Sequence, residues 1–428
     1  MRHRVHVVDQ RDYSVKAVRD RVGAVLEEDR VPVRGATVFV KPSFVYPARP
    51  PRNRGVNTQP EVVAGVARAL RDLGARRVLV GEDCLLGPSE CGFVAMGVLP
   101  LLRGVAEPVY LQNEERVAVR VERPFVEERF ALPRRLVEAD LFVSLPKLKT
   151  NMHSLVTLAA KNHLGLLLQD DRLTHHDRNL HEKLADLYRA RPADYVVTDA
   201  VVAGAGQGPM HAREVPVGVL IASANALAAD TVSCALMGIS PREVRYLALL
   251  NERGLGPLAL DEIEVRGEGL LAERGRRFDR PRSDFAQLPP GARVVCGPSA
   301  ACPEGCAGML RGSLEPHMAR GRKHRLDGWT FILGKGPIEV PRDLDPRRTL
   351  VVGDCAAEHR AAGRLVPGCP PRPMAITGAL LQAGVLGRIE MRYRDMLGGL
   401  LLHALEQGRA ACRGGVGAAT SRLFGRAR

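Results

Sequence analysis

Five of the nine cysteines lie close together late in the sequence, in positions that suggest a metal centre. They fall within 74 residues, whereas the other four are spread over the remaining 354. Two directly follow predicted strands, in ARVVC and LVVGDC, and three lie in the predicted loops PSAACPEGC and VPGCPPRP. Loops at the carboxyl ends of parallel strands meet at one edge of a sheet, so we expect a shared site. The five candidate ligands are Cys296, Cys302, Cys306, Cys355 and Cys369.

Thiolates are soft ligands that iron–sulfur clusters and zinc both accept. Structural zinc sites use closely paired cysteines, and only Cys302 and Cys306, at C-x3-C, have that spacing. The two prolines after Cys369 favour a cluster, because they fix the loop and remove competing donors near the sulfur. We therefore expect an iron–sulfur cluster, with zinc as the alternative. Cys296 and Cys355 could instead be buried small hydrophobic residues.

A second group of reactive side chains lies in the stretch LPKLKTNMHSLVTLAAKNHLG, residues 145–165. Lysine is rare in this chain, with 8 Lys against 54 Arg, and three of the eight are in this stretch. A helix beginning near Met152 would place His153, Thr157 and Lys161 on one face, because residues four apart stack. The alternative is that the apolar residues form a core face and the polar ones face water.

Ammonium groups, a hydroxyl, an amide and an imidazole near a helix start would bind an anion such as a carboxylate or phosphate. Polar residues after other predicted strands could converge on the same place. The candidate catalytic residues are Lys149, His153, Lys161 and His175, the last from the loop HHDRNLH. The candidate substrate-binding residues are Lys41, Asn57, Asp83, Lys147, Thr150, Asn162, Asp199 and Asp230.

The elements that position these residues alternate between short β-rich runs and amphipathic segments. This pattern predicts an α/β protein with a mostly parallel sheet and helices on both faces. Strands are predicted at 37–41, 77–82, 140–145, 194–198, 217–222 and 260–266, and helices at 61–73, 153–167, 180–190 and 226–237. A polar stretch at 267–291 separates a domain of residues 1–285 from a second one of 286–428. There we predict strands at 292–296, 330–333 and 349–352 and helices at 373–382 and 386–407.

Composition narrows the class of protein further. The net charge of +14 is dispersed and almost entirely arginine, and aromatic residues are only 4%, so we expect no nucleic-acid partner. No run of about 18 apolar residues occurs and the first residues lack a signal-peptide pattern, so we expect a cytoplasmic protein without a transmembrane segment. Nine cysteines in such a chain indicate thiols or metal ligands more than disulfides.

The stretch VPGCPPRP, at 366–373, resembles the cluster-binding signature of the twenty-kilodalton subunit of NADH:quinone oxidoreductase and, more loosely, the small subunit of nickel–iron hydrogenase. The resemblance covers roughly residues 292–383. It implies a 4Fe-4S cluster on a smaller flavodoxin-like α/β domain. The present chain lacks the adjacent paired cysteines of the respiratory subunit, so which four of the five cysteines ligate stays open.

The first domain resembles the family called domain of unknown function 362. The matching positions are Lys41-Pro42, NTQPE at 57–61, Gly81 before Glu82-Asp83, PKLKT at 146–150, Lys161-Asn162 with Gly165, and Asp199-Ala200. The resemblance covers about residues 35–266. Members are often iron–sulfur proteins, and the family implies no particular activity.

These observations predict a redox enzyme or electron-transfer protein that acts on a small anionic substrate or a redox partner protein. Two alternatives stay open: a non-redox, metal-assisted enzyme with a structural cluster, and a zinc-binding or cluster-carrier protein. No G-x-G-x-x-G follows a predicted strand and opens a helix, so no nicotinamide or flavin fingerprint is found.

Overall fold

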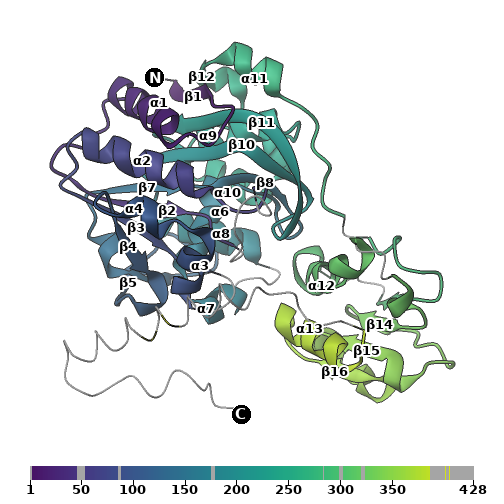
Figure 1. Cartoon of the computed structure of the whole chain (residues 1–428). Helices are drawn as coiled ribbons and strands as arrows, with labels where there is room; N and C mark the ends of the chain where they lie inside the picture. Colours follow the sequence, from purple (N-terminus) through teal and green to yellow (C-terminus); the bar gives the residue numbers. More distant parts are fainter. Residues whose placement is uncertain are drawn as a thin grey trace, which may run out of the picture.

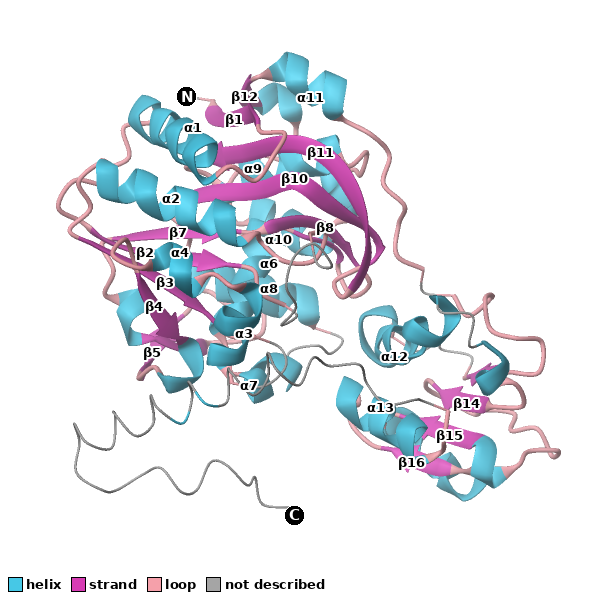
Figure 2. Ribbon diagram, in the orientation of Figure 1, coloured by secondary structure: helices cyan, strands magenta, loops and turns pink. Residues whose placement is uncertain are grey.

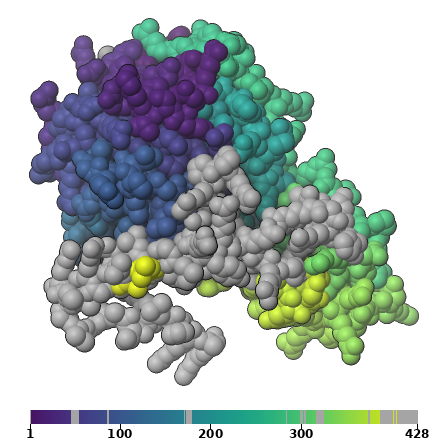
Figure 3. Space-filling view, viewed as in Figure 1, coloured from purple at the N-terminus to yellow at the C-terminus, as the bar shows by residue number. Residues whose placement is uncertain are grey.

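The computed structural model describes residues 2–45, 54–84, 88–174, 179–282, 284–297, 302–319 and 323–385, together with Leu401 and Ala404. Within these residues the chain forms a larger body and a smaller one, joined by an extended segment after α11, Glu268–Arg274 (Figure 1). Each body has its own sheet. Figure 3 shows the larger body in purple to teal and the smaller one in green to yellow.

The sheet of the larger body has the order β12-β1-β11-β10-β7-β2-β3-β4. Along this order the pairs are parallel except for β1 with β11 and β10 with β11, which are antiparallel. The α/β class with a mostly parallel sheet is thus confirmed. The strands are β1 (His3–Asp9), β2 (Thr37–Pro42), β3 (Arg77–Glu82), β4 (Glu107–Tyr110), β7 (Leu141–Leu145), β10 (Tyr195–Gln207), β11 (His211–Ser223) and β12 (Ile263–Arg266).

Helices cover both faces of this sheet (Figure 2). Alternate residues of a strand point to opposite faces, and Val38 and Val40 accordingly join one core while Phe39 joins the other. The first core is covered by α1 (Val15–Glu28) and α2 (Pro60–Asp72). The second is covered by α8 (Leu180–Ala190), α9 (Ala226–Leu236) and α10 (Arg245–Glu252). Burial on both faces explains why these strands read as continuous apolar runs.

Short elements and a hairpin complete the larger body. β5 (Arg116–Arg120) pairs with β6 (Arg129–Pro133) in a separate two-stranded sheet. The short helices are α3 (Ser89–Met96), α4 (Leu99–Leu102), α5 (Arg134–Val137) and α7 (Gln169–Thr174). None of the described helices combines the length and apolarity needed to span a bilayer.

The helix predicted for residues 153–167 is wrong over its first half. A hairpin of β8 (Lys147–Asn151) and β9 (Leu155–Thr157) stands there, and a short helix, α6 (Ala159–Asn162), follows. The Asn151 side-chain oxygen accepts the backbone N–H of His153 at 2.9 Å, a local turn that competes with a helix start. His153 is therefore at the hairpin tip and does not share a helix face with Lys161.

The smaller body contains a four-stranded parallel sheet in the order β13-β14-β15-β16. The strands are β13 (Arg293–Cys296), β14 (Thr330–Leu333), β15 (Thr349–Val352) and β16 (Arg364–Val366). One face packs on α12 (Gly308–Ala319) and α13 (Pro373–Gln382). The described strands follow sequence order, without the reversal that marks a flavodoxin arrangement. The helix predicted for 386–407 lies outside the described residues, apart from Leu401 and Ala404.

The two bodies touch where the β8–β9 hairpin meets α12. Gly312 of α12 faces Met152 so closely that a Cβ on the glycine would lie 3.0 Å from the Met152 Sδ and 3.3 Å from its Cε. Gly312 follows Cys306 by six residues, and Met152 follows Lys149 by three. The contact therefore joins the helix that follows the cysteine loop to the hairpin that carries the lysines.

Replacing Gly312 by leucine is expected to push α12 away from the hairpin, because even a Cβ already meets Met152 at less than van der Waals distance. Limited proteolysis should then cut the segment 275–291 severalfold faster. Gly378→Leu in α13 is the control, because a Cβ there meets nothing within 4 Å. Both changes favour helix by about 1 kcal/mol, so helix propensity cancels in the comparison. Equal cleavage rates in the two variants would contradict the contact.

Candidate functional site

A cluster of buried charged groups lies at the carboxyl edge of β2, β3 and β7. Lys41, near the end of β2, donates to the Glu82 Oε2 at 2.7 Å, to the Asn162 Oδ1 at 3.0 Å and to a backbone carbonyl at 2.9 Å. Glu82 ends β3, and Asn162 ends α6. Gly165 packs against this pair, since a Cβ there would lie 2.6 Å from the Lys41 Nζ. Three segments far apart in sequence thus meet around one ammonium.

The second lysine, Lys147, pairs with Asp199 of β10 at 2.8 Å, and both side chains are fully buried. The Lys147 Nζ also donates to the Tyr13 hydroxyl at 3.1 Å. Asp199 accepts the backbone N–H of Gln59 at 3.0 Å and of Val201 at 3.2 Å. This carboxylate is therefore satisfied by an ion pair and by backbone donors together.

Lys149 differs from these two lysines, because no carboxylate among the described residues pairs with it. Its Nζ donates to the Val56 carbonyl at 2.5 Å and to the Ser43 Oγ at 3.4 Å. Burial and then the positive charges of Lys147 and Lys161 hold the pKa of Lys149 well below its usual value. Burial of the amine and the neighbouring cations both disfavour its charged form.

Lys161 of α6 is also buried, and the described residues offer its ammonium no hydrogen-bond acceptor. Burial, with a smaller effect from the Arg172 charge, lowers the pKa of Lys161 to about 8. Arg172 of α7 pairs with Asp83 at 2.7 Å. Burial raises the pKa of Asp83 to about 6 despite this partner. The carboxylate also accepts from the Ser89 hydroxyl at 3.0 Å.

The cations of this cluster outnumber its carboxylates. We call the following residues the lysine cluster: Lys41, Lys147, Lys149, Lys161 and Arg172 with Glu82, Asp83 and Asp199. Three of the cations are paired with carboxylates, and Lys161 is a surplus cation, whereas burial disfavours the charged form of Lys149. A buried surplus of positive groups favours a bound anion, which would supply the missing negative charge.

Other predicted substrate-binding residues have structural contacts. Asp230 of α9 accepts the backbone N–H groups of Ala159 and Ala160 at 2.8 and 3.1 Å, and so caps α6. The Asn57 Oδ1 accepts a backbone N–H, and the Thr150 hydroxyl donates to a backbone carbonyl. Substrate binding by these three residues and a catalytic role of His153 stay predictions. His175 lies outside the described residues.

The pH dependence of stability tests the position of Asp230. Burial raises its pKa to about 7, so the folded chain keeps a proton that the unfolded chain releases near 3.8. This contribution to stability is complete below pH 3.8 and is lost as the pH rises through about 7. The free energy of unfolding of the wild type minus that of Asp230→Asn should therefore fall across this window and level off above it. Urea denaturation at a series of pH values measures this difference. A difference that rises instead would contradict the raised pKa.

Arg172 of the lysine cluster and Tyr13, which contacts Lys147, were not predicted from sequence. Arg172 lies in a short polar helix with no motif around it, and Tyr13 lies in a loop before α1. Tyr13 reaches the cluster only because β1 pairs with β11, which places the loop after β1 beside β10. No pattern in either segment indicates these contacts.

In the smaller body, three loops bring four cysteines together. Cys306 lies against the turn after β15, since a Cβ on Gly353 would be 2.6 Å from the Cys306 Sγ. Gly353 has φ 91°, a conformation that favours glycine. In the same way, a Cβ on Gly305 would lie 3.2 Å from the Cys302 Cβ and 3.6 Å from the Pro370 Cβ. Pro370 directly follows Cys369, so the loops of residues 302–306, 353–355 and 369–371 are in contact.

Electrostatics agree with this arrangement. Burial, followed by the negative charges of Cys369, Cys302 and Cys355, raises the pKa of Cys306 to about 12. Cys296 does not belong to these three loops. It ends β13, two strands away from β15, and strands are spaced by about 4.8 Å, so its backbone lies roughly 10 Å from that strand.

Within the described part of the chain, no three Cys, His, Asp or Glu side chains converge as a single ion requires. One zinc ion draws four donors to within about 2.3 Å of one point. In a 4Fe-4S cluster each cysteine binds a different iron, so the sulfurs lie farther apart. The four thiols of the three touching loops thus form no single-ion site among the described residues, and binding of a 4Fe-4S cluster or of zinc stays a prediction.

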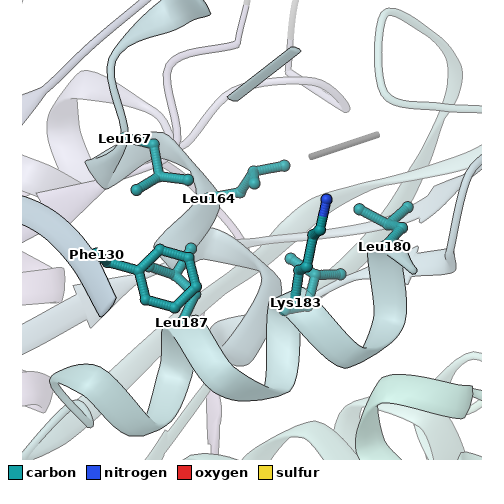
Figure 4. A pocket seen from close by; sticks show the side chains of 7 residues that line it. Phe130, Leu164, Leu167, Leu180, Lys183 and Leu187 are labelled. Carbon is teal, nitrogen blue, oxygen red and sulfur yellow. The ribbon is translucent and has the colours of Figure 1, made fainter. Parts of the chain in front are cut away.

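An apolar recess lies elsewhere on the larger body (Figure 4). It is lined by Phe130, Leu164, Leu167, Leu180, Lys183, Leu184 and Leu187. These side chains come from β6, α8 and the turn after α6, and most belong to the core between them. The recess contains one charged side chain and no group of the lysine cluster.

Comparisons with known proteins bear on the larger body. The family model "Domain of unknown function (DUF362)" matches residues 38–235, so the predicted resemblance is confirmed for this part of the chain. The thylakoid-associated protein sll1697 of Synechocystis sp. is 28% identical over 233 residues, which are 53% of this chain and 71% of that protein. The resemblance of residues 292–383 to the twenty-kilodalton subunit lies outside the family match and stays a prediction.

Two solved structures are similar to the chain. The lactate racemase apoprotein of Thermoanaerobacterium thermosaccharolyticum has a TM-score of 0.36 and 11% identity, over 56% of this chain and 58% of that one. A protein from Thermotoga maritima has a TM-score of 0.33 and 10% identity, over 78% of this chain and 90% of that one. Neither TM-score reaches 0.5, so neither structure bears on the function of this chain.

Proposed function

We propose that the chain is a 4Fe-4S protein that acts in redox chemistry on a small anionic substrate. The cluster ligands would be Cys302, Cys306, Cys355 and Cys369. The observation that carries the proposal is the contact between three cysteine-bearing loops at the carboxyl edge of the smaller sheet. Cys296, at the end of β13, is left out of the ligand set.

The charges of the cysteine loops support this ligand set. Four neighbouring thiolates repel one another, and Asp354 adds a further negative charge. A metal centre removes this repulsion, because thiolate ligands are deprotonated when they bind metal. Because Gly353 has no side chain, it leaves space for the Cys306 sulfur, which a Cβ at this position would meet. When bound, the cluster would supply one-electron chemistry at this edge of the smaller body.

The substrate class follows from the lysine cluster. Lys161, which has no carboxylate partner among the described residues and stays mostly protonated at pH 7, leaves a surplus positive charge in a buried place, and this charge would bind and orient an anion. Lys41 and Lys147, each held by an ion pair, would keep the surrounding backbone in place. The Met152 contact at Gly312 links this site to the cysteine loops.

The test is anaerobic purification of the full chain, followed by iron, acid-labile sulfide and zinc analysis. We expect iron and sulfide in equal amounts with little zinc. Stoichiometric zinc without sulfide would contradict the cluster and would show that the cysteines bind zinc. A reversible reduction followed by EPR would separate a redox-active cluster from a structural one, since a structural cluster in a non-redox enzyme need not change oxidation state.

A further inference from the structure

We infer that the Lys149 amine is a nucleophile that forms an imine with the carbonyl carbon of an anionic carbonyl compound. This inference rests on the anion site proposed above and names the substrate class of that site. A compound with a carboxylate beside a ketone or aldehyde group, a 2-oxo acid, would meet both requirements. The carboxylate would bind the surplus positive charge, and the carbonyl would lie next to the amine.

The hydrogen bonds of Lys149 separate it from the paired lysines. Its Nζ contacts two neutral oxygens, the Val56 carbonyl at 2.5 Å and the Ser43 Oγ at 3.4 Å. Lys41 and Lys147 instead have carboxylate oxygens at 2.7 and 2.8 Å. An ammonium with only neutral partners gains little to offset the loss of its hydration. The geometry thus favours the neutral amine, which keeps a lone pair.

The surrounding charge acts in the same direction. Lys147, Lys161 and Lys41 all lie near enough to disfavour a further positive charge on Lys149, and Glu82 opposes them. Glu82 already pairs with Lys41. A lysine that is desolvated and next to other cations is the form in which this residue acts as a nucleophile towards carbonyl groups.

Lys161 can supply the proton that the reaction needs. Its pKa of about 8 keeps it mostly protonated at pH 7, yet close enough to neutrality to transfer a proton. No acceptor among the described residues occupies its ammonium. It is also one of the cations that act on Lys149, so the two lysines belong to the same cluster.

The reaction balances without a further reagent. The Lys149 nitrogen lone pair attacks the carbonyl carbon, and the C=O π bond breaks to give a carbinolamine. The carbinolamine oxygen takes a proton from the Lys161 ammonium and leaves as water, while the nitrogen lone pair forms the C=N bond. The imine carries the positive charge that Lys161 gave up. Ser43, whose Oγ lies beside the amine, would orient the nitrogen.

The experiment uses the full chain with pyruvate and sodium cyanoborohydride, which reduces an imine to a stable secondary amine. Peptide mapping by mass spectrometry then locates the label, and we expect it on Lys149. Lys149→Arg keeps a positive charge but cannot form an imine, so its label at this position should disappear. Lys16→Arg is the control, because Lys16 is an exposed lysine with 79% of its side chain accessible, and Lys149 labelling should be unchanged.

Mapping on the wild type needs no variant, so the test survives if Lys149→Arg fails to fold. Thermal shift with pyruvate, without the reductant, measures anion binding separately. Stabilisation by pyruvate with no label on Lys149 would overturn the imine and leave the anion site standing. No stabilisation and no label would overturn both. Label confined to Lys16 or other exposed amines would also overturn the inference, because any accessible lysine reacts slowly.

Discussion

Replacing Cys306 by serine should strip the protein of most of its iron. Cys306 is partly buried, and its sulfur lies against Gly353 in the turn that follows β15. A serine oxygen is a harder ligand than a thiolate and binds a cluster less well. Iron and sulfide analysis after anaerobic purification, together with the loss of the visible absorption of the cluster, would measure the effect.

Cys296→Ser is the matched control for this experiment. Cys296 belongs to the same sheet and is exposed, but the structure leaves it two strands from β15. Its replacement should leave the iron content unchanged. Equal iron loss in both variants would show that Cys296 is a ligand. Unchanged iron in Cys306→Ser would contradict the proposed ligand set.

The second large effect is expected from Lys147→Met. This change leaves the Asp199 carboxylate in the interior without its ion-pair partner, although the side chains are of similar length. Removal of one partner from a buried ion pair costs about 3–5 kcal/mol, because an uncompensated charge stays buried. The free energy of unfolding from urea denaturation at pH 7 should fall by that amount.

Lys16→Met provides the comparison for a lysine–aspartate pair at the surface. Lys16 pairs with Asp20 at 2.9 Å, one helical turn away, and its side chain is 79% exposed. Exposed pairs of this kind contribute about 0.3–0.5 kcal/mol. The tenfold difference between the two variants tests burial alone, since the pair distances are nearly equal. Similar losses in both would contradict the role of burial.

Much of the fold could be predicted, because strands that are buried on both faces of a sheet have apolar sequences that are easily recognised. The strands at 37–42 and 77–82 are continuous apolar runs, and the helices at 180–190 and 373–382 have the predicted bounds. The first strand and helix were not predicted, although both are regular. β1 begins HRVHVVD, where histidine and arginine interrupt the apolar pattern because this strand lies near the edge of the sheet.

The hairpin at 147–157 shows why local patterns fail at a site. Residues 153, 157 and 161 have helical spacing, but Val156 and Thr157 are β-branched and pair with Thr150 and Lys149. Leu155 adopts φ 65°, which no local preference of leucine predicts. Tertiary contacts with β10 and with the Asp230 cap select the hairpin over the helix.

The sequence predicted most of the residues that belong to the candidate site, but it did not predict which of them contact one another. The scarcity of lysine pointed to Lys41, Lys147, Lys149 and Lys161, and all four belong to the cluster. Sequence could not separate the paired lysines from the two without a carboxylate, because that depends on where β3 and β10 place their acids. The sequence also could not separate Cys296 from the other four cysteines, because that depends on the order of the strands in the smaller sheet.

The attachment of the connecting segment to the long strands has a mechanical consequence. The carbonyl of Asp279 accepts the N–H of Gly206, and Arg282 binds Gln207, so the segment is anchored at the far end of β10. Only about ten residues lie between Arg282 and β13, and a linker of this length spans at most ~35 Å. If the smaller body detached from the β8–β9 hairpin, this linker would keep it near the hairpin at an effective concentration of the order of millimolar. Rebinding would therefore be an intramolecular event.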